Sequence, residues 1–291
     1  MAKIITKESK PGPGISKNEP EKRRFFLFFE LLGAKIGKLI QLNFIYTIAI
    51  IPLFIGLYFS ISLNRDLKSL ADLAKMPIFT INPDYISLII LAVSVFITGP
   101  ATAGSVFVLR NMQRREHAWI WSDFWAQFKK NYLQGVAMAA IDIVVYTLLY
   151  VAFNFYMYIM PADMPAAGTM MPKIAAGLIG AVTIIFTWAH YYIYTMMVTF
   201  KLKLNKIIKN SIIFAFGKLW HNILITAILA AIMLGCLYLF LLSPMALALI
   251  VACILFSFMG FVIVFVTYPT IDSNMIQRAN KQTRVLNTRD V

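Results

Sequence analysis

The sequence predicts an all-α protein, a polytopic membrane bundle of six transmembrane helices with amphipathic interfacial helices on the cytoplasmic side. Three observations predict this fold: an apolar composition, six long apolar segments, and basic residues that alternate between loops. The chain is 60% hydrophobic and only 14% charged, whereas soluble domains are near half apolar and a quarter charged. The six segments cover residues 39–63, 85–109, 136–160, 174–200, 220–242 and 245–268.

Each apolar segment is long enough to cross a bilayer as a helix. An α-helix rises about 1.5 Å per residue, and the hydrocarbon core is about 30 Å thick. A helix also pairs all of its backbone groups within one segment, which lipid requires. The segments are continuously apolar rather than alternating, which excludes a transmembrane β-barrel.

The distribution of basic residues sets the predicted orientation. Of the 27 Lys and Arg residues, 23 lie in the first, third, fifth and seventh stretches outside the segments. Positive charge accumulates on the cytoplasmic side of membrane helices, so we expect both termini in the cytoplasm. The net charge of +14 then reflects orientation and contact with anionic lipid, and we expect the lipid bilayer, not nucleic acid, as its partner.

The chain divides into three predicted regions. Residues 1–21 form a polar, basic tail with no apolar core, which we expect to be mobile. Residues 22–268 form the six-span membrane domain, and residues 269–291 form a cytoplasmic C-terminal tail. Ser243 and Pro244 are typical of a helix start, and this tight turn predicts an antiparallel hairpin of the last two spans.

Two segments are predicted to lie at the membrane surface. In 23–38, basic side chains occupy one side of a helical wheel and four phenylalanines the other, which is typical of an interfacial helix. It serves either as an anchor or as a docking surface for a partner. In the largest inner loop, Ser122 is a candidate cap for a helix over 123–135. The expected interfacial anchors are Arg23, Arg24, Lys35, Lys38, Trp121 and Trp125.

The second apolar segment contains an unusual run of small and polar residues. The run includes Thr98, Gly99, Pro100, Ala101, Ala103 and Gly104. Pro100 predicts a kink, the small residues allow close helix packing, and we expect Thr98 and Thr102 to pair carbonyls that the kink frees. The run is either a packing seam or a broken helix that lines a solute path.

Two ionisable residues lie inside the predicted bilayer. Asp142 and His190 are about 9 and 15 Å from the inner ends of their segments at helical rise. Because burying either charge alone is costly, we expect the two side chains to form one polar bridge, extended by Asn43 or Asn154. The bridge is either structural or part of a proton or solute site.

The sequence contains none of the common catalytic motifs. It has no phosphate-binding loop, no HExxH and no GxSxG pattern, and its three histidines are dispersed. The two cysteines, Cys236 and Cys253, lie in apolar segments and predict buried, inert thiols. We therefore expect a protein that is not an enzyme and that uses no cofactor and no metal.

Several of these residues resemble one known family. Leu42 and Asn43, the run 98–103, and Asp123 with Phe124 before 128–131 are similar to the YesL-like integral membrane proteins of bacteria, a family defined by a domain of unknown function. The resemblance covers roughly residues 25–230. It implies the six-span topology and an association with carbohydrate ABC transporters of Gram-positive bacteria. It implies no catalytic residue. The signature residues without an assigned role are Thr98, Gly99, Pro100, Ala101, Asp123 and Phe124.

Three functions follow as hypotheses. The leading one is a non-enzymatic auxiliary subunit of a carbohydrate ABC importer, which packs against the permease subunits through segment 98–104 and the two surface helices. The second is a small-solute channel or transporter with a water-filled path lined by Thr98, Asn154, Asp142 and His190. The third is a general membrane scaffold or assembly factor. The sequence names neither a solute nor an oligomeric state.

Overall fold

The computed structural model describes residues 23–62, 85–160 and 170–277, and this part of the chain is helical without any strand. The chain divides into two compact units, Met1–Ala34 and Lys35–Val291. The described part of the first unit is the beginning of the first helix, where the exposed rings of Phe25 and Phe29 pack edge to face at 5.0 Å. The predicted tail 1–21 lies outside the described residues.

The helices follow the six apolar segments and add shorter elements between them. In chain order they are α1 (Arg24–Ser62), α3 (Tyr85–Gln113), α4 (Ile120–Lys130), α5 (Tyr132–Asn154), η2 (Phe155–Ile159), α6 (Met170–Thr199), α7 (Leu204–Gly217), α8 (Leu219–Leu242), α9 (Pro244–Ile250), η5 (Val251–Leu255), α10 (Phe256–Ile271) and η6 (Asp272–Ile276). The three η elements are π-helical turns, which often continue an α-helix.

Several helices are long and apolar enough to span a membrane, as expected for a membrane protein. By length and composition, five qualify among the described residues: Arg24–Gly56, Tyr132–Ile159, Met170–Thr199, Leu219–Leu242 and Pro244–Ile276. The predicted second segment, 85–109, is helical and lies within α3, but α3 is not one of these five. The count of six spans therefore stays a prediction.

Two predicted helix boundaries are wrong. The surface helix 23–38 and the first span form one continuous helix, α1. The helix expected over 123–135 begins earlier, at Ile120, and is interrupted at Asn131, after which α5 begins. The last apolar segment, 245–268, lies within a helical stretch that continues through Ile276.

The start of α4 has a local cause. Trp119 is the residue before the helix, and its backbone N–H donates to Oδ2 of Asp123 at 2.9 Å. This bond satisfies a donor at the end of the helix, as in a capping box. Ser122, the predicted cap, instead lies within the first turn. Ser243 does cap α9, where its Oγ accepts from the N–H of Ala246.

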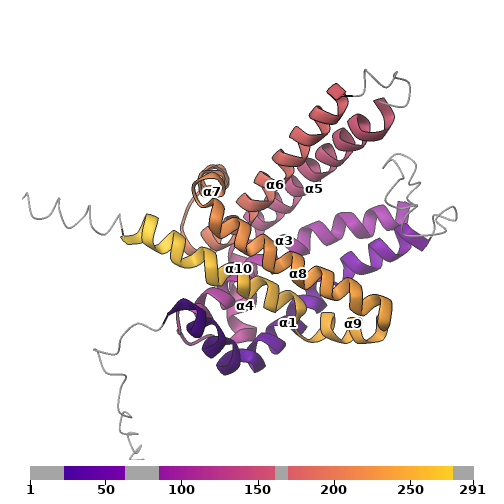
Figure 1. The fold of residues 1–291 in the computed structure, drawn as a ribbon. Helices are drawn as coiled ribbons and strands as arrows, with labels where there is room; N and C mark the ends of the chain where they lie inside the picture. Colours follow the sequence, from indigo (N-terminus) through magenta and orange to yellow (C-terminus); the bar gives the residue numbers. More distant parts are fainter. Residues whose placement is uncertain (1–22, 63–84, 161–169, 278–291) are drawn as a thin grey trace, which may run out of the picture. The chain divides into compact units, whose positions relative to one another are not determined.

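Within the second unit, α3 is the central helix and contacts α4, α5, α6 and α10. The helices α5 and α6 run side by side as a hairpin (Figure 1). The contact of α3 with α5 is a backbone contact, because a β-carbon on Gly135 would lie 2.6 Å from the nitrogen of Pro100. Gly104 gives the same close approach to α4, since a β-carbon there would lie 2.7 Å from the carbonyl oxygen of Phe124.

Candidate functional site

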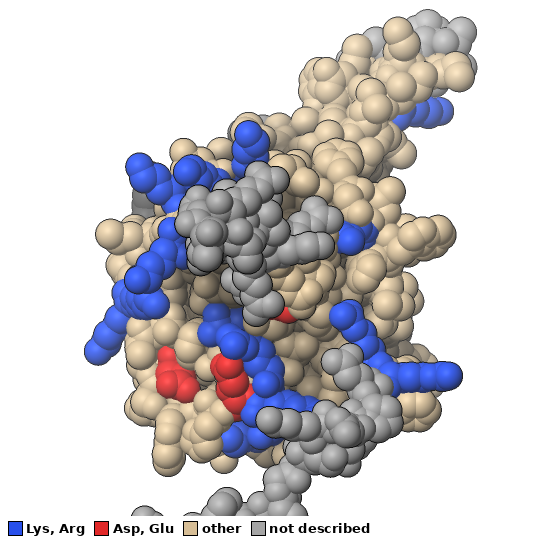
Figure 2. Space-filling view, turned by 90° about the vertical axis from the view of Figure 1, so that its left-hand side faces the viewer, with Lys and Arg blue, Asp and Glu red and all other residues tan. Residues whose placement is uncertain are grey.

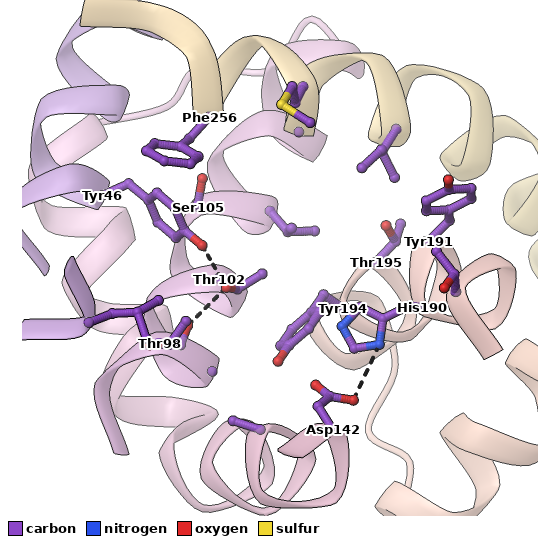
Figure 3. Close-up of a pocket in the computed structure, with 18 of the residues that line it drawn as sticks. Tyr46, Thr98, Thr102, Ser105, Asp142, His190, Tyr191, Tyr194, Thr195 and Phe256 are labelled. Atoms are coloured by element: carbon purple, nitrogen blue, oxygen red, sulfur yellow. Dashed lines mark hydrogen bonds and ion pairs between the residues drawn. The ribbon is translucent and has the colours of Figure 1, made fainter. Parts of the chain in front are cut away.

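A cavity of about 1100 Å³ lies beside α3, among the helices of the second unit. Its lining comes from α1, α3, α5, α6 and α10 (Figure 3). Most of the lining is apolar or aromatic, and the charged or titratable residues that face it include Asp142 and His190. Pockets that bind small molecules have this character, with volumes of about 300–1,000 Å³ and a few polar groups among apolar walls.

Asp142 of α5 and His190 of α6 face each other across the cavity wall (Figure 3). The Nδ1 atom of His190 lies 3.5 Å from Oδ1 of Asp142. The structure therefore brings together the two ionisable residues that the sequence places inside the bilayer. Among the described residues, neither of these two atoms has a hydrogen-bond partner. The two atoms are near each other but do not form a hydrogen bond. Both atoms can therefore bind a further polar group.

Aromatic rings hold the imidazole of His190 in position. Tyr194, one turn along α6, packs against it edge to face at 5.4 Å between ring centroids, and Phe186 lies on its other side at 6.2 Å. Nearby, the hydroxyls of Tyr146 and Thr187 are 3.1 Å apart and join α5 to α6. These contacts fix the polar pair on two packed helices rather than on a loop.

Hydroxyl groups of α3 line another wall of the same cavity. Thr102 Oγ1 lies 3.0 Å from Tyr46 Oη and donates to the carbonyl of Thr98 at 2.8 Å (Figure 3). Thr98 in turn donates to the carbonyl of Ser94 at 2.6 Å. The carbonyl that Pro100 releases is that of Phe96, four residues earlier, so the expectation that these threonines pair it is wrong. Each threonine hydroxyl instead donates to the carbonyl four residues earlier, on the preceding turn of α3.

The small-residue run of α3 packs inside the chain. Ala101 and Ala103 are fully buried, Gly99 meets Gly135, and Gly104 meets Phe124. The run thus packs on α4 at Phe124, one of the residues that carry the family resemblance. The chain's own α5 and α4 thus contact Gly99 and Gly104 of this seam, and its contact with a permease stays a prediction.

Asn43 is a second buried polar centre, away from the pair Asp142 and His190. Its Nδ2 donates to the carbonyls of Val251 and Ala252 at 2.8 and 2.7 Å, and its Oδ1 accepts from the N–H of Ser257 at 3.0 Å. Val251 and Ala252 belong to the π-helical turn η5, whose wider pitch disturbs the regular backbone ladder, and Ser257 lies in the first turn of α10. Asn43 therefore ties α1 to the last helix and does not extend the polar bridge.

Asn154 also lies apart from the bridge, since its Nδ2 donates to the carbonyl of Tyr150 one turn earlier in α5. It is not among the residues that line the cavity. Of the path predicted from Thr98, Asn154, Asp142 and His190, the structure therefore places three residues around one cavity and leaves out the fourth.

The predicted interfacial anchors have different environments. Arg23, Arg24 and Trp121 are exposed, and Lys35 is partly buried. Lys38 donates from Nζ to the carbonyl of Ala118 at 3.3 Å. Trp125 is half-buried, and its ring packs against Phe128. Their role at a membrane surface stays a prediction.

The sequence reasoning missed Arg110 and Gly135. Arg110 is buried at the end of α3, where Nη1 donates to the carbonyl of Val198 at 2.7 Å and Nη2 to Oδ1 of Asn111 at 3.0 Å. It thereby caps the end of α6. Its signal in the sequence is a basic residue directly after an apolar segment. In the distribution of basic residues it counts only as one of the charges expected in the cytoplasm.

No group of three or more metal-ligating side chains occurs in the described part of the chain, and both cysteines are free. The arrangement offers instead an apolar cavity with one acidic and one imidazole group and several hydroxyls. Such a set can bind a small solute that carries both apolar and hydrogen-bonding groups.

Residues 39–153 match the profile of a family described as "Protein of unknown function, DUF624". The match contains Asn43, the run 98–104, Asp123 with Phe124, and Asp142. It covers less than half of the 291 residues and supports a relationship to an uncharacterised family. No curated protein and no solved structure matches the chain.

Proposed function

We propose that this protein binds a small solute inside the membrane and moves it across, as a transporter in its own right. The observation that carries the proposal is the cavity of about 1100 Å³, where Thr98, Asp142 and His190 lie on three different helices. Ionisable residues inside a membrane are costly and commonly mark solute or proton pathways. The solute we propose is small and amphiphilic, because the polar groups form only part of a largely apolar lining.

A proline inside α3, next to the cavity wall, supports the same function. Transporters commonly place discontinuous or bent helices at their central binding site, and Pro100 lies inside α3 between Thr98 and Thr102, which line the cavity.

Water access to the cavity tests this function before the solute is known. In a background with Cys236 and Cys253 replaced by Ser, we expect a charged, water-soluble thiol reagent to label Thr98→Cys and Ala140→Cys. Leu148→Cys is the matched control, because Leu148 is 64% exposed on α5 and does not line the cavity. Equal labelling of all three variants, or of none, contradicts a water-filled cavity.

Flux is the second test. Liposomes that contain the protein should swell faster than empty ones in isotonic solutions of small sugars and polyols, and Asp142→Asn should slow the swelling. Swelling at the rate of empty liposomes with every solute in the series counts against transport by this chain alone.

A second candidate function is a non-enzymatic auxiliary subunit of a carbohydrate ABC importer. The resemblance to the YesL-like family favours it, and the match of residues 39–153 to an uncharacterised family is consistent with that name. Because Gly99 and Gly104 already pack against the chain's own α5 and α4, we propose that the contact with a permease uses the exposed sides of α5 and α6. Crosslinking in cells followed by mass spectrometry should then recover permease subunits at a constant ratio, whereas a general scaffold should recover them substoichiometrically.

The proposed location is the plasma membrane of a Gram-positive bacterium, with both termini in the cytoplasm. The alternation of basic loops supports this orientation. A protease added to intact protoplasts should leave tags at both ends of the chain uncut, and cleavage of either tag contradicts the orientation.

A further inference from the structure

A second cavity, of about 610 Å³, lies where α4 joins α5 and α6 leads into α7. We propose that it binds the phosphate of an anionic phospholipid headgroup. Four lysines line it: Lys129 and Lys130 at the end of α4, and Lys201 and Lys203 after the end of α6. It is separate from the cavity of Asp142 and His190, so the proposal does not depend on transport.

The charge of this pocket is unbalanced. No acidic side chain is among its lining residues, and no ion pair joins any of the four lysines to a carboxylate in the described part of the chain. Lys and Arg side chains gather on one face of the molecule, where acidic ones are few (Figure 2). The orientation rule explains why an inner loop carries basic residues. It does not explain why lysines from two separate loops line the same cavity.

Helix ends could work against an anion here, because α4 and α6 both end at the pocket and helix C-termini carry partial negative charge. Side chains of the protein already occupy carbonyls at these ends. Arg110 donates to Val198, Gln134 donates to Leu202 at 3.0 Å, and Asn131 donates to Gln127 at 3.1 Å. The carbonyls are thus partly neutralised, and the lysine ammonium groups remain available for a ligand.

The position of the pocket indicates a lipid rather than a free anion. Two long apolar helices meet it, since α5 begins at Tyr132 and α6 ends at Thr199. Beside the lysines, the lining includes Tyr132, Phe200 and Leu133, and the last is 80% exposed. A phospholipid would place its phosphate among the lysines and its acyl chains along the apolar sides. Basic pockets between membrane helices bind anionic headgroups in this way.

Lipid binding by the purified full chain tests the proposal. The probes are phosphatidylglycerol, phosphatidylcholine and inorganic phosphate, with binding measured by native mass spectrometry from detergent. The variant replaces Lys129, Lys130, Lys201 and Lys203 by Gln. The matched control replaces Lys173, Lys206, Lys209 and Lys218 by Gln, which changes the net charge equally outside the pocket lining.

We expect the pocket variant to lose phosphatidylglycerol affinity on the order of tenfold or more, because each lysine near an anionic headgroup contributes. The control should stay within about twofold of the parent, and phosphatidylcholine should bind weakly throughout. Equal losses in the two variants, or no loss in either, overturn the site. Inorganic phosphate that competes as well as the lipid overturns the assignment to a lipid.

A measurement on the unchanged protein guards against a variant that fails to fold. Phosphatidylglycerol with a photoactivatable group in its acyl chain should crosslink to peptides containing residues 132–134 or 197–202. The version with all four lysines replaced by Arg should retain binding, because it keeps the charge. Crosslinks confined to other helices contradict the proposal.

Discussion

Gly99 and Gly135 bring the backbones of α3 and α5 into direct contact: a β-carbon added to Gly135 would lie 2.8 Å from the carbonyl carbon of Gly99. Close approach of this kind is how helices associate in a membrane, where lipid provides little hydrophobic drive between them and dense packing must supply the attraction. The contact also fixes α5, and with it Asp142, against the wall of the cavity.

Gly99→Ala and Gly135→Ala should each destabilise the fold by about 1–3 kcal/mol or more, because the added methyl group meets backbone atoms that cannot rotate away. Gly177→Ala and Gly180→Ala are the controls, since nothing lies within 4 Å of a β-carbon at either position in α6. These should be neutral or gain about 0.5–1 kcal/mol from helix propensity. Denaturant unfolding in mild detergent measures all four, and equal effects contradict the close contact.

Asn43→Ala should destabilise the protein by roughly 1–3 kcal/mol for each buried backbone group left without a partner. The groups concerned are the carbonyls of Val251 and Ala252 and the N–H of Ser257. Asn43→Asp keeps the acceptor and loses the donors, so its unfolding free energy should also fall. Asn205→Ala, at an exposed position of α7, should change little. An Asn43→Ala variant as stable as this control would show that the hydrogen bonds contribute nothing.

The pair Asp142 and His190 should behave as one unit. In a cycle of Asp142→Asn, His190→Gln and the double variant, the stability changes should differ from additivity by about 0.5–3 kcal/mol, as expected for residues in contact. Asp142→Asn combined with Asn205→Ala is the distant reference pair and should be additive. Simple additivity in both cycles means that the 3.5 Å approach carries no interaction energy.

Arg110→Gln should lower the free energy of unfolding by about 1–3 kcal/mol, because the carbonyl of Val198 loses a charged donor inside the protein. Arg110→Lys should recover only part of this loss, since one ammonium cannot reproduce a planar guanidinium that contacts both Val198 and Asn111. Arg114→Gln is the control. Its bond to Glu116 is half exposed, and such pairs contribute about 0–1 kcal/mol. The same unfolding titration ranks the three variants.

Much of the fold could be predicted because apolar length alone identifies a membrane helix. Helix ends in the structure lie within a few residues of the segment ends for three predicted segments, 136–160, 174–200 and 220–242. The helix boundaries were harder to predict. The side chain of Asp123 accepts a hydrogen bond from the N–H of Trp119 and so helps to set the start of α4. Residues outside the apolar segments extend α1 and the last helix.

The candidate site was only partly predictable. Asp142 and His190 stood out because charge is rare inside lipid, and their segments are neighbours along the chain, so their meeting followed from topology. Asn43 looked equally available, but its partners include backbone atoms of a π-helical turn and of the start of α10, more than 200 residues away. Backbone acceptors of this kind leave no mark in the side-chain sequence.

The sequence by itself determined that this is a helical membrane protein, and it located the apolar segments and the few polar groups within them. Only the tertiary structure decided which faces meet: Gly99 against Gly135, Gly104 against Phe124, and the polar pair at the wall of a cavity. The reason is physical. Lipid and protein interior are both apolar, so hydrophobicity marks what lies in the membrane but does not distinguish a surface that faces lipid from one that faces another helix.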